Sequence, residues 1–316
     1  MKKSVQCSRI FVSFALVFCM LFGMMGIVDA GSYTNTLNPG VRTTRTVTPE
    51  RHTVKIYISG GKNGSALKKD SLPGWITVNT SNADYYLATI TGNTTTSVRR
   101  GSIVFTKGSN TYELYVVQNP FIVKTTSGSG PNISNVNFTT AGGTTDLYAL
   151  YSCNVTGTIP DWLTVKQDGN KYTLTARPNL NGSQRYCTLS FTKTLSTYEK
   201  VTRTVKITQF ANTLTGVPST MDFPIDGAEK SFTVTTGYGT VKATVANGYS
   251  YWLRVFQNGN KITIHCDRNI TTSTRTGYVH ITIGDISKTV KVTMAKGYGI
   301  PEPIGIAFSP DSTPHF

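Results

Sequence analysis

Aromatic rings and cationic side chains are the residues in this sequence that could recognise a ligand. Aromatic faces stack on sugar rings, and tyrosine combines an apolar face with a polar tip. The candidate tyrosines are Tyr238, Tyr249 and Tyr251, which precede Trp252 in a Gly- and Asn-rich stretch, and the adjacent Tyr85 and Tyr86. Neighbouring strand residues point to opposite faces, so one of the adjacent pair should face solvent. Tyrosines on a surface need not bind anything, and that simpler interpretation stays open.

Three arginines occupy matching places in three related segments and form the second candidate group. They are Arg99, Arg185 and Arg275, each two residues before Gly101, Cys187 or Gly277. A guanidinium can pair with a carboxylate or sulfate on an acidic sugar. The alternative is that each arginine lies along the rim of a folded unit with its stem packed on apolar surface.

Patterns typical of catalysis or metal binding are missing from the sequence. The four histidines are His52, His265, His280 and His315. None stands at a metal-ligand spacing from Cys or another His, and His265 and Cys266 should face opposite sides of a strand. A glycosidase needs two carboxylates about 5 to 10 Å apart, whereas acids near the related segments, such as Asp161, are not repeated. We expect no enzyme activity, no cofactor and no metal.

The elements that must position these residues repeat three times. Each copy opens on one of the three tryptophans, Trp75, Trp162 and Trp252, followed by Ile or Leu and, two residues further, Val. A second alternating strand, an Asn-rich turn, the arginine and two further strands follow in register. A tryptophan that heads an alternating strand in every copy is expected to pack in the core rather than to stack on sugars.

A period near 90 residues is too long for a solenoid and fits one small β domain per copy. Short strands with period-2 alternation, separated by Gly, Asn, Asp and Pro turns, are typical of antiparallel β-sandwiches. The predicted fold class is all-β, with three tandem immunoglobulin-like antiparallel β-sandwiches. The expected division is residues 31–41 as an N-terminal linker, 42–120, 121–212 and 213–298 as the sandwiches, and 299–316 as a Pro-rich tail.

The first thirty residues read as a secretory signal peptide. Lys2, Lys3 and Arg9 precede an apolar run, and small residues end the segment before Gly31. A retained anchor is the alternative, since the run is about long enough to span a bilayer. We expect export to the periplasm, the cell surface or the medium, and no membrane span in the mature chain.

The composition favours anionic partners. The full sequence has 31 Lys+Arg and 16 Asp+Glu, and residues 1–30 hold three of the basic residues and one of the acidic ones. Residues 31–316 therefore have 28 basic and 15 acidic residues, a net charge of +13. Acidic glycans, nucleic acid or lipid headgroups would suit that charge. The alternative is a basic surface that binds no partner, because the basic residues are scattered.

The mature chain keeps Cys153, Cys187 and Cys266. Cys153 and Cys187 are a possible disulfide because they share a copy, and three free thiols are the alternative.

The repeated Trp-[Ile/Leu]-x-Val phrase, the Asn/Thr turn, the Arg-x-Gly before a strand and the closing Val-x-x-Gln resemble the BACON domain family. The resemblance extends over residues 42–296, with departures at Cys187 and at Met294, where the pattern has Gly and Gln. It implies an immunoglobulin-like sandwich exported by Bacteroidetes, with a role proposed in binding glycans or mucin. Some members of the family resemble plain spacers.

These observations predict an exported, non-catalytic protein that binds a glycan or mucin, an acidic one in particular. The alternative is a structural spacer, an adhesin shaft or a module that docks another exported or surface protein, without intrinsic sugar binding. No nucleic-acid partner is expected.

Overall fold

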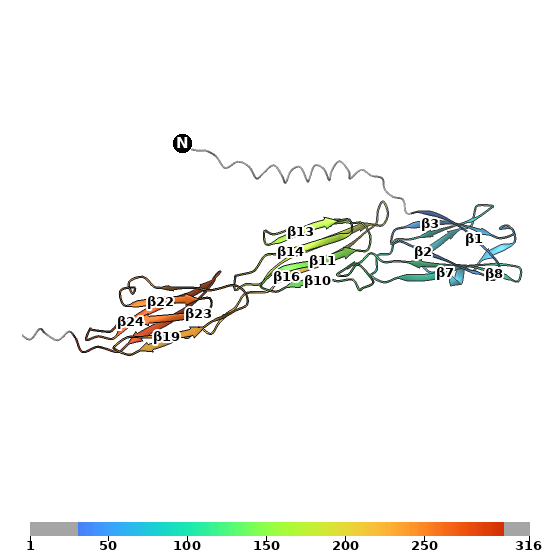
Figure 1. Cartoon of the computed structure of the whole chain (residues 1–316). Coiled ribbons are helices and arrows are strands. Elements are labelled where there is room, and N and C mark those ends of the chain that lie inside the picture. The colour runs from blue at the N-terminus through green and yellow to red at the C-terminus, as the bar shows by residue number, and fades with distance from the viewer. Residues whose placement is uncertain (1–30, 300–316) are drawn as a thin grey trace, which may run out of the picture.

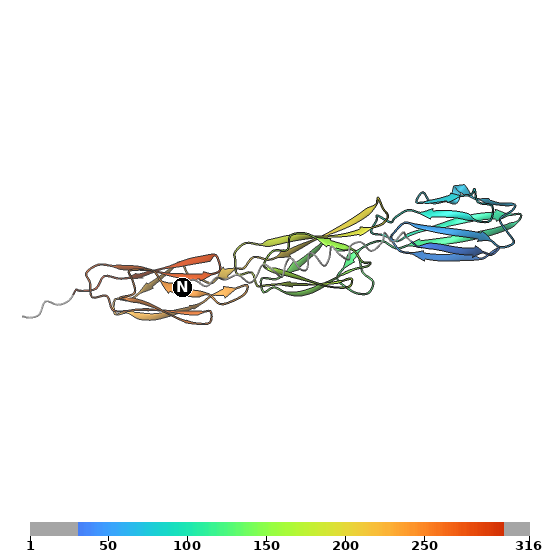
Figure 2. The same ribbon diagram turned by 90° about the horizontal axis from the view of Figure 1, so that it is seen from above.

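Three β-sandwiches stand in a row along the chain, as the two perpendicular views in Figures 1 and 2 show. The computed structural model describes residues 31–299. The expected signal peptide lies outside the described residues, as does the expected tail from residue 300 onward. We call the sandwiches module 1 (31–120), module 2 (121–212) and module 3 (213–299). The predicted fold class, three tandem immunoglobulin-like sandwiches, is confirmed.

Module 1 consists of two four-stranded sheets. One sheet has the order β1 (Ser32–Leu37), β3 (His52–Ile58), β6 (Tyr86–Ile90), β5 (Ile76–Asn79). The other has the order β2 (Arg42–Val47), β8 (Asn110–Gln118), β7 (Arg99–Lys107), β4 (Ser65–Leu67), and a 3-10 turn η1 (Lys69–Ser71) follows β4.

Module 2 also has two four-stranded sheets, whereas module 3 has a three-stranded sheet, a four-stranded sheet and a separate two-stranded one. In module 2 the sheets are β13 (Leu163–Asp168), β14 (Lys171–Ala176), β11 (Gly143–Ala149), β9 (Val123–Lys124), and β10 (Asn135–Phe138), β16 (Lys200–Gln209), β15 (Arg185–Thr194), β12 (Asn154–Thr156). In module 3 they are β19 (Ala228–Thr233), β23 (Lys261–Cys266), β22 (Leu253–Asn258), and β18 (Thr220–Phe223), β25 (Ile286–Met294), β24 (Arg275–Ile283), β21 (Lys242–Val245), with the short pair β17 (Leu214–Thr215) and β20 (Thr235–Thr236).

The prediction of a linker at residues 31–41 is wrong for most of these residues, because β1 belongs to module 1. This strand pairs in parallel with β3, from Ser32 opposite Thr53 to Leu37 opposite Ile58. Leu37 is buried in the core. The first sandwich therefore begins at Ser32 rather than at residue 42. In each module a short strand also runs parallel to the last strand, as β2 with β8, β10 with β16 and β18 with β25.

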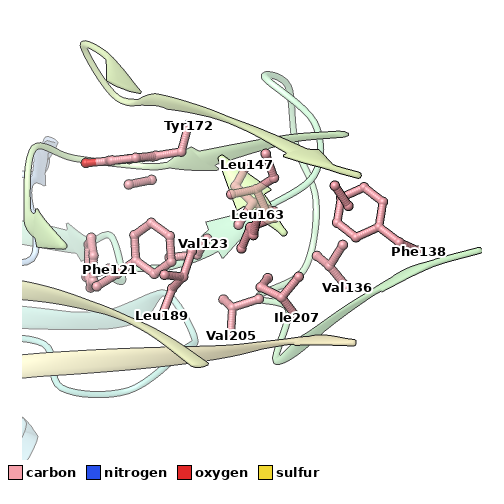
Figure 3. Packing of buried hydrophobic residues seen from close by; sticks show 14 of the residues in the cluster. Phe121, Val123, Val136, Phe138, Leu147, Leu163, Tyr172, Leu189, Val205 and Ile207 are labelled. Atoms are coloured by element: carbon pink, nitrogen blue, oxygen red, sulfur yellow. The ribbon is translucent and has the colours of Figure 1, made fainter. Parts of the chain in front are cut away.

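Each module has its own hydrophobic core between its two sheets. Strand alternation creates it: β3 buries every second side chain, among them Val54, Ile56 and Ile58. Figure 3 shows the core of module 2, where Phe121 and Val123 from its first strand region meet Leu189, Val205 and Ile207 of the opposite sheet. The outward faces are thereby left to polar side chains and to the few aromatics that break the pattern.

Modules 1 and 2 contact each other directly. Lys193 at the end of β15 places its Nζ atom 2.6 Å from Oε1 of Glu50, and both side chains are mostly buried. Next to this pair, the backbone amide of Arg51 donates to the carbonyl of Leu195 over 2.9 Å. Arg203 of module 2 donates to the carbonyl of Thr95 at 2.6 Å. The joint therefore combines an ion pair with main-chain hydrogen bonds.

The contact between modules 2 and 3 uses corresponding parts of the two sandwiches. The amide of Gly182, in the Asn-rich turn before β15, donates to Oδ1 of Asp285 at 2.6 Å. Asn212 bonds Tyr238 twice, through its Nδ2 to the carbonyl and its Oδ1 to the amide, both at 3.0 Å. At both joints the Asn-rich turn of one module meets the last hairpin of the next module.

Candidate functional site

The three predicted arginines occupy one structural position. Each is the first residue of a long strand and faces the last residue of the next strand along the chain, with which it pairs. The facing pairs are Arg99 with Gln118, Arg185 with Gln209, and Arg275 with Met294.

In module 1 the arginine is engaged by its own module. Arg99 donates from Nε to Gln118 Oε1 at 3.2 Å and from Nη2 to the carbonyl of Thr91 at 2.7 Å. Its guanidinium lies over the ring of Trp75, 4.7 Å from the centroid. Gln118 is fully buried, and its Nε2 donates to the carbonyls of Glu50 and Thr91 at 2.9 and 3.0 Å. Arg99 thus belongs to a closed polar network.

Module 2 repeats the network. Arg185 donates to Gln209 Oε1 at 2.9 Å and to the carbonyl of Arg177 at 2.8 Å, over the ring of Trp162 at 4.9 Å. Burial lowers the pKa of both Arg99 and Arg185. These two arginines fit the rim interpretation, because most of their donors are used within the fold.

Module 3 departs from the network at its closing residue. Met294 is fully buried where the other modules have glutamine. A thioether is at best a weak acceptor, so it cannot replace the glutamine carbonyl. Among residues 31–299, the hydrogen bond of the Arg275 side chain goes to the carbonyl of Arg268 at 3.3 Å. Its guanidinium is 5.8 Å from the rings of both Trp252 and Tyr251.

The adjacent tyrosines of module 1 face opposite ways. Tyr86 is only 3% exposed, stacks on Phe105 and bonds Ser65, so its assignment as a ligand-binding residue is wrong. Tyr85 lies on the outward face, with its ring centroid 5.6 Å from that of Tyr57. The inward direction of Tyr86 follows from the parity of β6, whose alternate residues enter the core.

Tyr57, Tyr85 and Lys55 form what we call the tyrosine platform, on the outward face of the β1-β3-β6-β5 sheet. The Lys55 amine is 5.2 Å from the centroid of the Tyr85 ring. Thr36 on β1 and Leu87 on β6 lie next to these side chains in the sheet register. Tyr57 and Lys55 were not among the predicted site residues, although the alternating run of residues 55–58 places both on one face.

The same positions carry different chemistry in the other modules. In module 2 they hold Tyr148, with Asp146 and Lys171 joined in an ion pair of 3.0 Å. In module 3 they hold Thr233 and Lys261, which are paired across β19 and β23. Two neighbouring tyrosines, with rings tilted at 50° and an amine beside them, therefore occur at this place in module 1 and not in the other two modules.

The three loop tyrosines do not form one cluster. Tyr238 lies at the joint with module 2 and is 42% exposed, whereas Tyr249 packs partly against the core and makes an edge contact with Tyr278. Tyr251 is 70% exposed. Of the three, Tyr251 is the most accessible ring, and it lies beside Arg275.

The tryptophans differ in burial. Trp252 is 1% exposed in the core of module 3, while Trp75 and Trp162 pack against their cores and remain half-buried. The indoles of Trp75 and Trp162 are covered by the stacked arginines of their modules.

The possible disulfide between Cys153 and Cys187 is wrong for this structure, where both thiols are free. Cys153 precedes β12, whose register places Asn154 opposite Thr192 on β15. Cys187 lies five residues before Thr192, about 17 Å along a strand. A disulfide needs Cα atoms no more than about 7 Å apart.

Among residues 31–299, no three His, Cys, Asp or Glu side chains are grouped so that they could hold a metal ion. His265 faces outward between Glu229 and Asp267, at 3.3 and 3.0 Å, while Cys266 is buried. Within the same residues, the structure has no helix that is long and apolar enough to cross a lipid bilayer.

Two segments of the chain, residues 66–119 and 233–293, match the sequence model of the BACON family, described as "Putative binding domain, N-terminal". They lie in modules 1 and 3. The matches support a binding module on an immunoglobulin-like β fold. No curated protein sequence matches the chain.

Solved structures with similar architecture include the I9–I11 tandem of titin, at 8% identity and a TM-score of 0.36, covering 86% of this chain and 99% of that one. The I67–I69 fragment of titin has 7% identity and a TM-score of 0.28, covering 82% and 96%. An endo-fucoidan hydrolase of glycoside hydrolase family 107 has 12% identity and a TM-score of 0.25, covering 83% of this chain and 44% of the enzyme. These low scores carry no functional conclusion.

Proposed function

We propose that this chain is an exported, non-catalytic protein that binds a glycan, mucin-like and acidic, through its β-sandwich modules. The tyrosine platform of module 1 is the observation that carries the proposal. Tyr57 and Tyr85 are half-buried on the outward face of the sheet, and their rings are tilted at 50° to each other. The apolar side of a pyranose ring can lie on such a surface.

Lys55 supplies the charge preference. Its amine lies 5.2 Å from the Tyr85 ring and has no ion-pair partner among the described residues. A sulfate or carboxylate on a sugar stacked over Tyr85 would lie within reach of this amine. The net charge of +13 on residues 31–316 would add attraction that is sensitive to salt.

The test is retention of residues 31–316 on immobilised mucin, followed by a glycan array, at low and at physiological salt. Tyr85→Ala and Tyr57→Ala should each weaken binding about tenfold, which corresponds to about 1.4 kcal/mol. Tyr148→Ala is the matched control, because it removes a tyrosine from the same position in module 2. Equal retention of all variants, or binding that disappears at physiological salt, would overturn the proposal.

A spacer or shaft is the second candidate function, and the two joints favour it. The Glu50–Lys193 ion pair and the Gly182–Asp285 hydrogen bond join the ends of successive modules. Such contacts would hold three modules in an extended row and carry a neighbouring domain or partner away from a surface. This function predicts no retention on any glycan together with a rod-like form in small-angle X-ray scattering, and a docking role would add a protein partner in pull-downs.

A further inference from the structure

Arg275 differs from its two counterparts in what it binds, although the three arginines share one position in the fold. Arg99 and Arg185 each give two or more hydrogen bonds to a buried glutamine and to backbone carbonyls. A guanidinium has five N–H donors. Within residues 31–299, Arg275 uses one of them, on the carbonyl of Arg268. Its remaining donors are therefore available to a ligand.

The cause is the residue on the opposite strand. Gln118 and Gln209 each place a carbonyl oxygen against the arginine, and Met294 offers a thioether there. Met294 is fully buried, so the exchange keeps the core filled while it removes the acceptor. A single residue thus separates a structural arginine from one with unused donors.

An exposed aromatic ring stands beside these donors. Tyr251 is 70% exposed, and its ring centroid is 5.8 Å from the Arg275 guanidinium. Among the described residues Arg275 forms no ion pair, since Asp267 pairs with Arg254 at 2.8 Å and Asp226 pairs with Arg268 at 3.4 Å. The surroundings therefore leave a positive charge next to an accessible ring.

The turn beside Arg275 also differs from its two counterparts in what it contacts. In modules 1 and 2 the Asn-rich turn next to the arginine contacts the following module, for example through Thr95 and Gly182. In module 3 the corresponding turn begins at Asn269, and Ile270 within it is 47% exposed. Within residues 31–299 this turn contacts the chain that follows β25, where the amide of Gly297 donates to the carbonyl of Thr271 at 2.7 Å, and these contacts use none of the Arg275 donors.

We propose that Arg275 and Tyr251 form a binding site for a sulfated or carboxylated sugar at the turn-bearing end of module 3. The sugar ring stacks on Tyr251 while its anionic group accepts hydrogen bonds from Arg275. The inference rests on the proposed glycan-binding function, but its residues are separate from the tyrosine platform of module 1.

The experiment is an NMR titration of residues 31–316, which follows the Arg275 Nε–H and Trp252 indole signals. The probes are galactose 6-sulfate, galacturonate and neutral galactose. The dissociation constant obtained from these shifts should be at least tenfold lower for one or both anionic sugars than for galactose. The anionic sugar with the lower constant identifies the preferred anionic group. Arg275→Gln and Tyr251→Ala should each weaken that binding at least fivefold, whereas Arg185→Gln, the matched control in module 2, should leave it unchanged.

Met294→Gln is the reciprocal test, because it restores the glutamine of modules 1 and 2. The new glutamine should accept hydrogen bonds from Arg275 and so weaken sugar binding at least fivefold. If this variant does not fold, the binding measured for Arg275→Gln tests the site. Binding that is equal for wild type and Arg275→Gln, or that does not distinguish galactose from its anionic derivatives, overturns the site. The two proposals have separate readouts and can fail independently. A Tyr85→Ala variant that loses mucin retention but keeps the sugar-induced shift of the Arg275 signal would show that the two sites bind independently.

Discussion

Glu50 of module 1 and Lys193 of module 2 form an ion pair of 2.6 Å across the first joint, with side chains only 16% and 14% exposed. Removing one member of a buried pair leaves the other charge desolvated without compensation. Lys193→Ala should therefore destabilise the joint by about 3 kcal/mol. Hydrogen exchange of the Arg51 amide reports on this directly, because that amide donates to Leu195 in module 2. Exchange as slow as in wild type would contradict the prediction, and Lys171→Ala, from an exposed pair inside module 2, serves as control.

The same pair should make the joint sensitive to acid. Burial by itself raises the pKa of Glu50, but hydrogen bonds from Lys193 and Thr48 outweigh it, so the pKa lies below its ordinary value of 4.5. A carboxyl whose pKa is depressed by folding contributes stability above its unfolded pKa and loses it as the pH falls through the folded value. Exchange at Arg51 should thus be unaffected from pH 8 to pH 5 and speed up below pH 4.5, after correction for intrinsic rates. A Glu50→Gln variant should lack this acid-dependent step, and its persistence there would assign the effect to another group.

The buried glutamine of modules 1 and 2 should be a stability determinant, which gives a third prediction. Gln118→Met copies the residue of module 3 and leaves the carbonyls of Glu50 and Thr91 without the amide that now donates to them. We expect module 1 to lose about 2 kcal/mol. Differential scanning calorimetry of residues 31–316 should show a lower transition for one module, while Gln167→Met, on the exposed hairpin of module 2, should not move it. An unchanged profile for Gln118→Met would mean that these hydrogen bonds add nothing to folding.

Much of this architecture could be predicted from local signals. The tryptophan phrase, the Asn-rich turn and the spacing near 90 residues predicted three sandwiches, because each signal describes a strand or a turn that forms from neighbouring residues. The Asp168-Gly169-Asn170 hairpin turn is an example, with Gly169 at φ +56° between β13 and β14.

What could not be predicted depends on pairing between distant segments. The role of residues 32–37 as β1 needs their partner β3, and the choice between Tyr85 and Tyr86 needs the register of β6. The difference between Arg275 and its counterparts was visible as Met294 in the sequence, but its meaning required the cross-strand pairing of those two residues. The joints likewise arise from contacts between loops of different modules.

Gly101 and Cys187 occupy the same strand position and lead to a fourth prediction. A Cβ atom on Gly101 would lie 2.2 Å from Cγ of Pro73 and 3.3 Å from the Trp75 ring, whereas module 2 accommodates the Cys187 side chain at this place. Gly101→Cys should cost about 1–3 kcal/mol through overpacking. Cys187→Gly should cost less, and the difference is measured from the shift of each module's calorimetric transition. Equal shifts would contradict the prediction, because the contact with Pro73 would then add nothing to the cost of Gly101→Cys.

The three thiols of residues 31–316 should stay unpaired and react unequally. Burial, reinforced by the charge of Asp267, raises the pKa of Cys266 to about 12, and burial also raises the pKa of Cys187. Because the thiolate is the reactive form, Ellman's reagent at pH 8 should leave Cys266 unlabelled in the native protein and label all three cysteines after denaturation. Cys153 and Cys187 are half-buried, so they should react slowly. Reduced and non-reduced samples should migrate alike in gel electrophoresis, with Cys153→Ser as the control. A faster-migrating non-reduced band that disappears in this variant would restore the disulfide, and it would require β12 to pair with β15 in a different register.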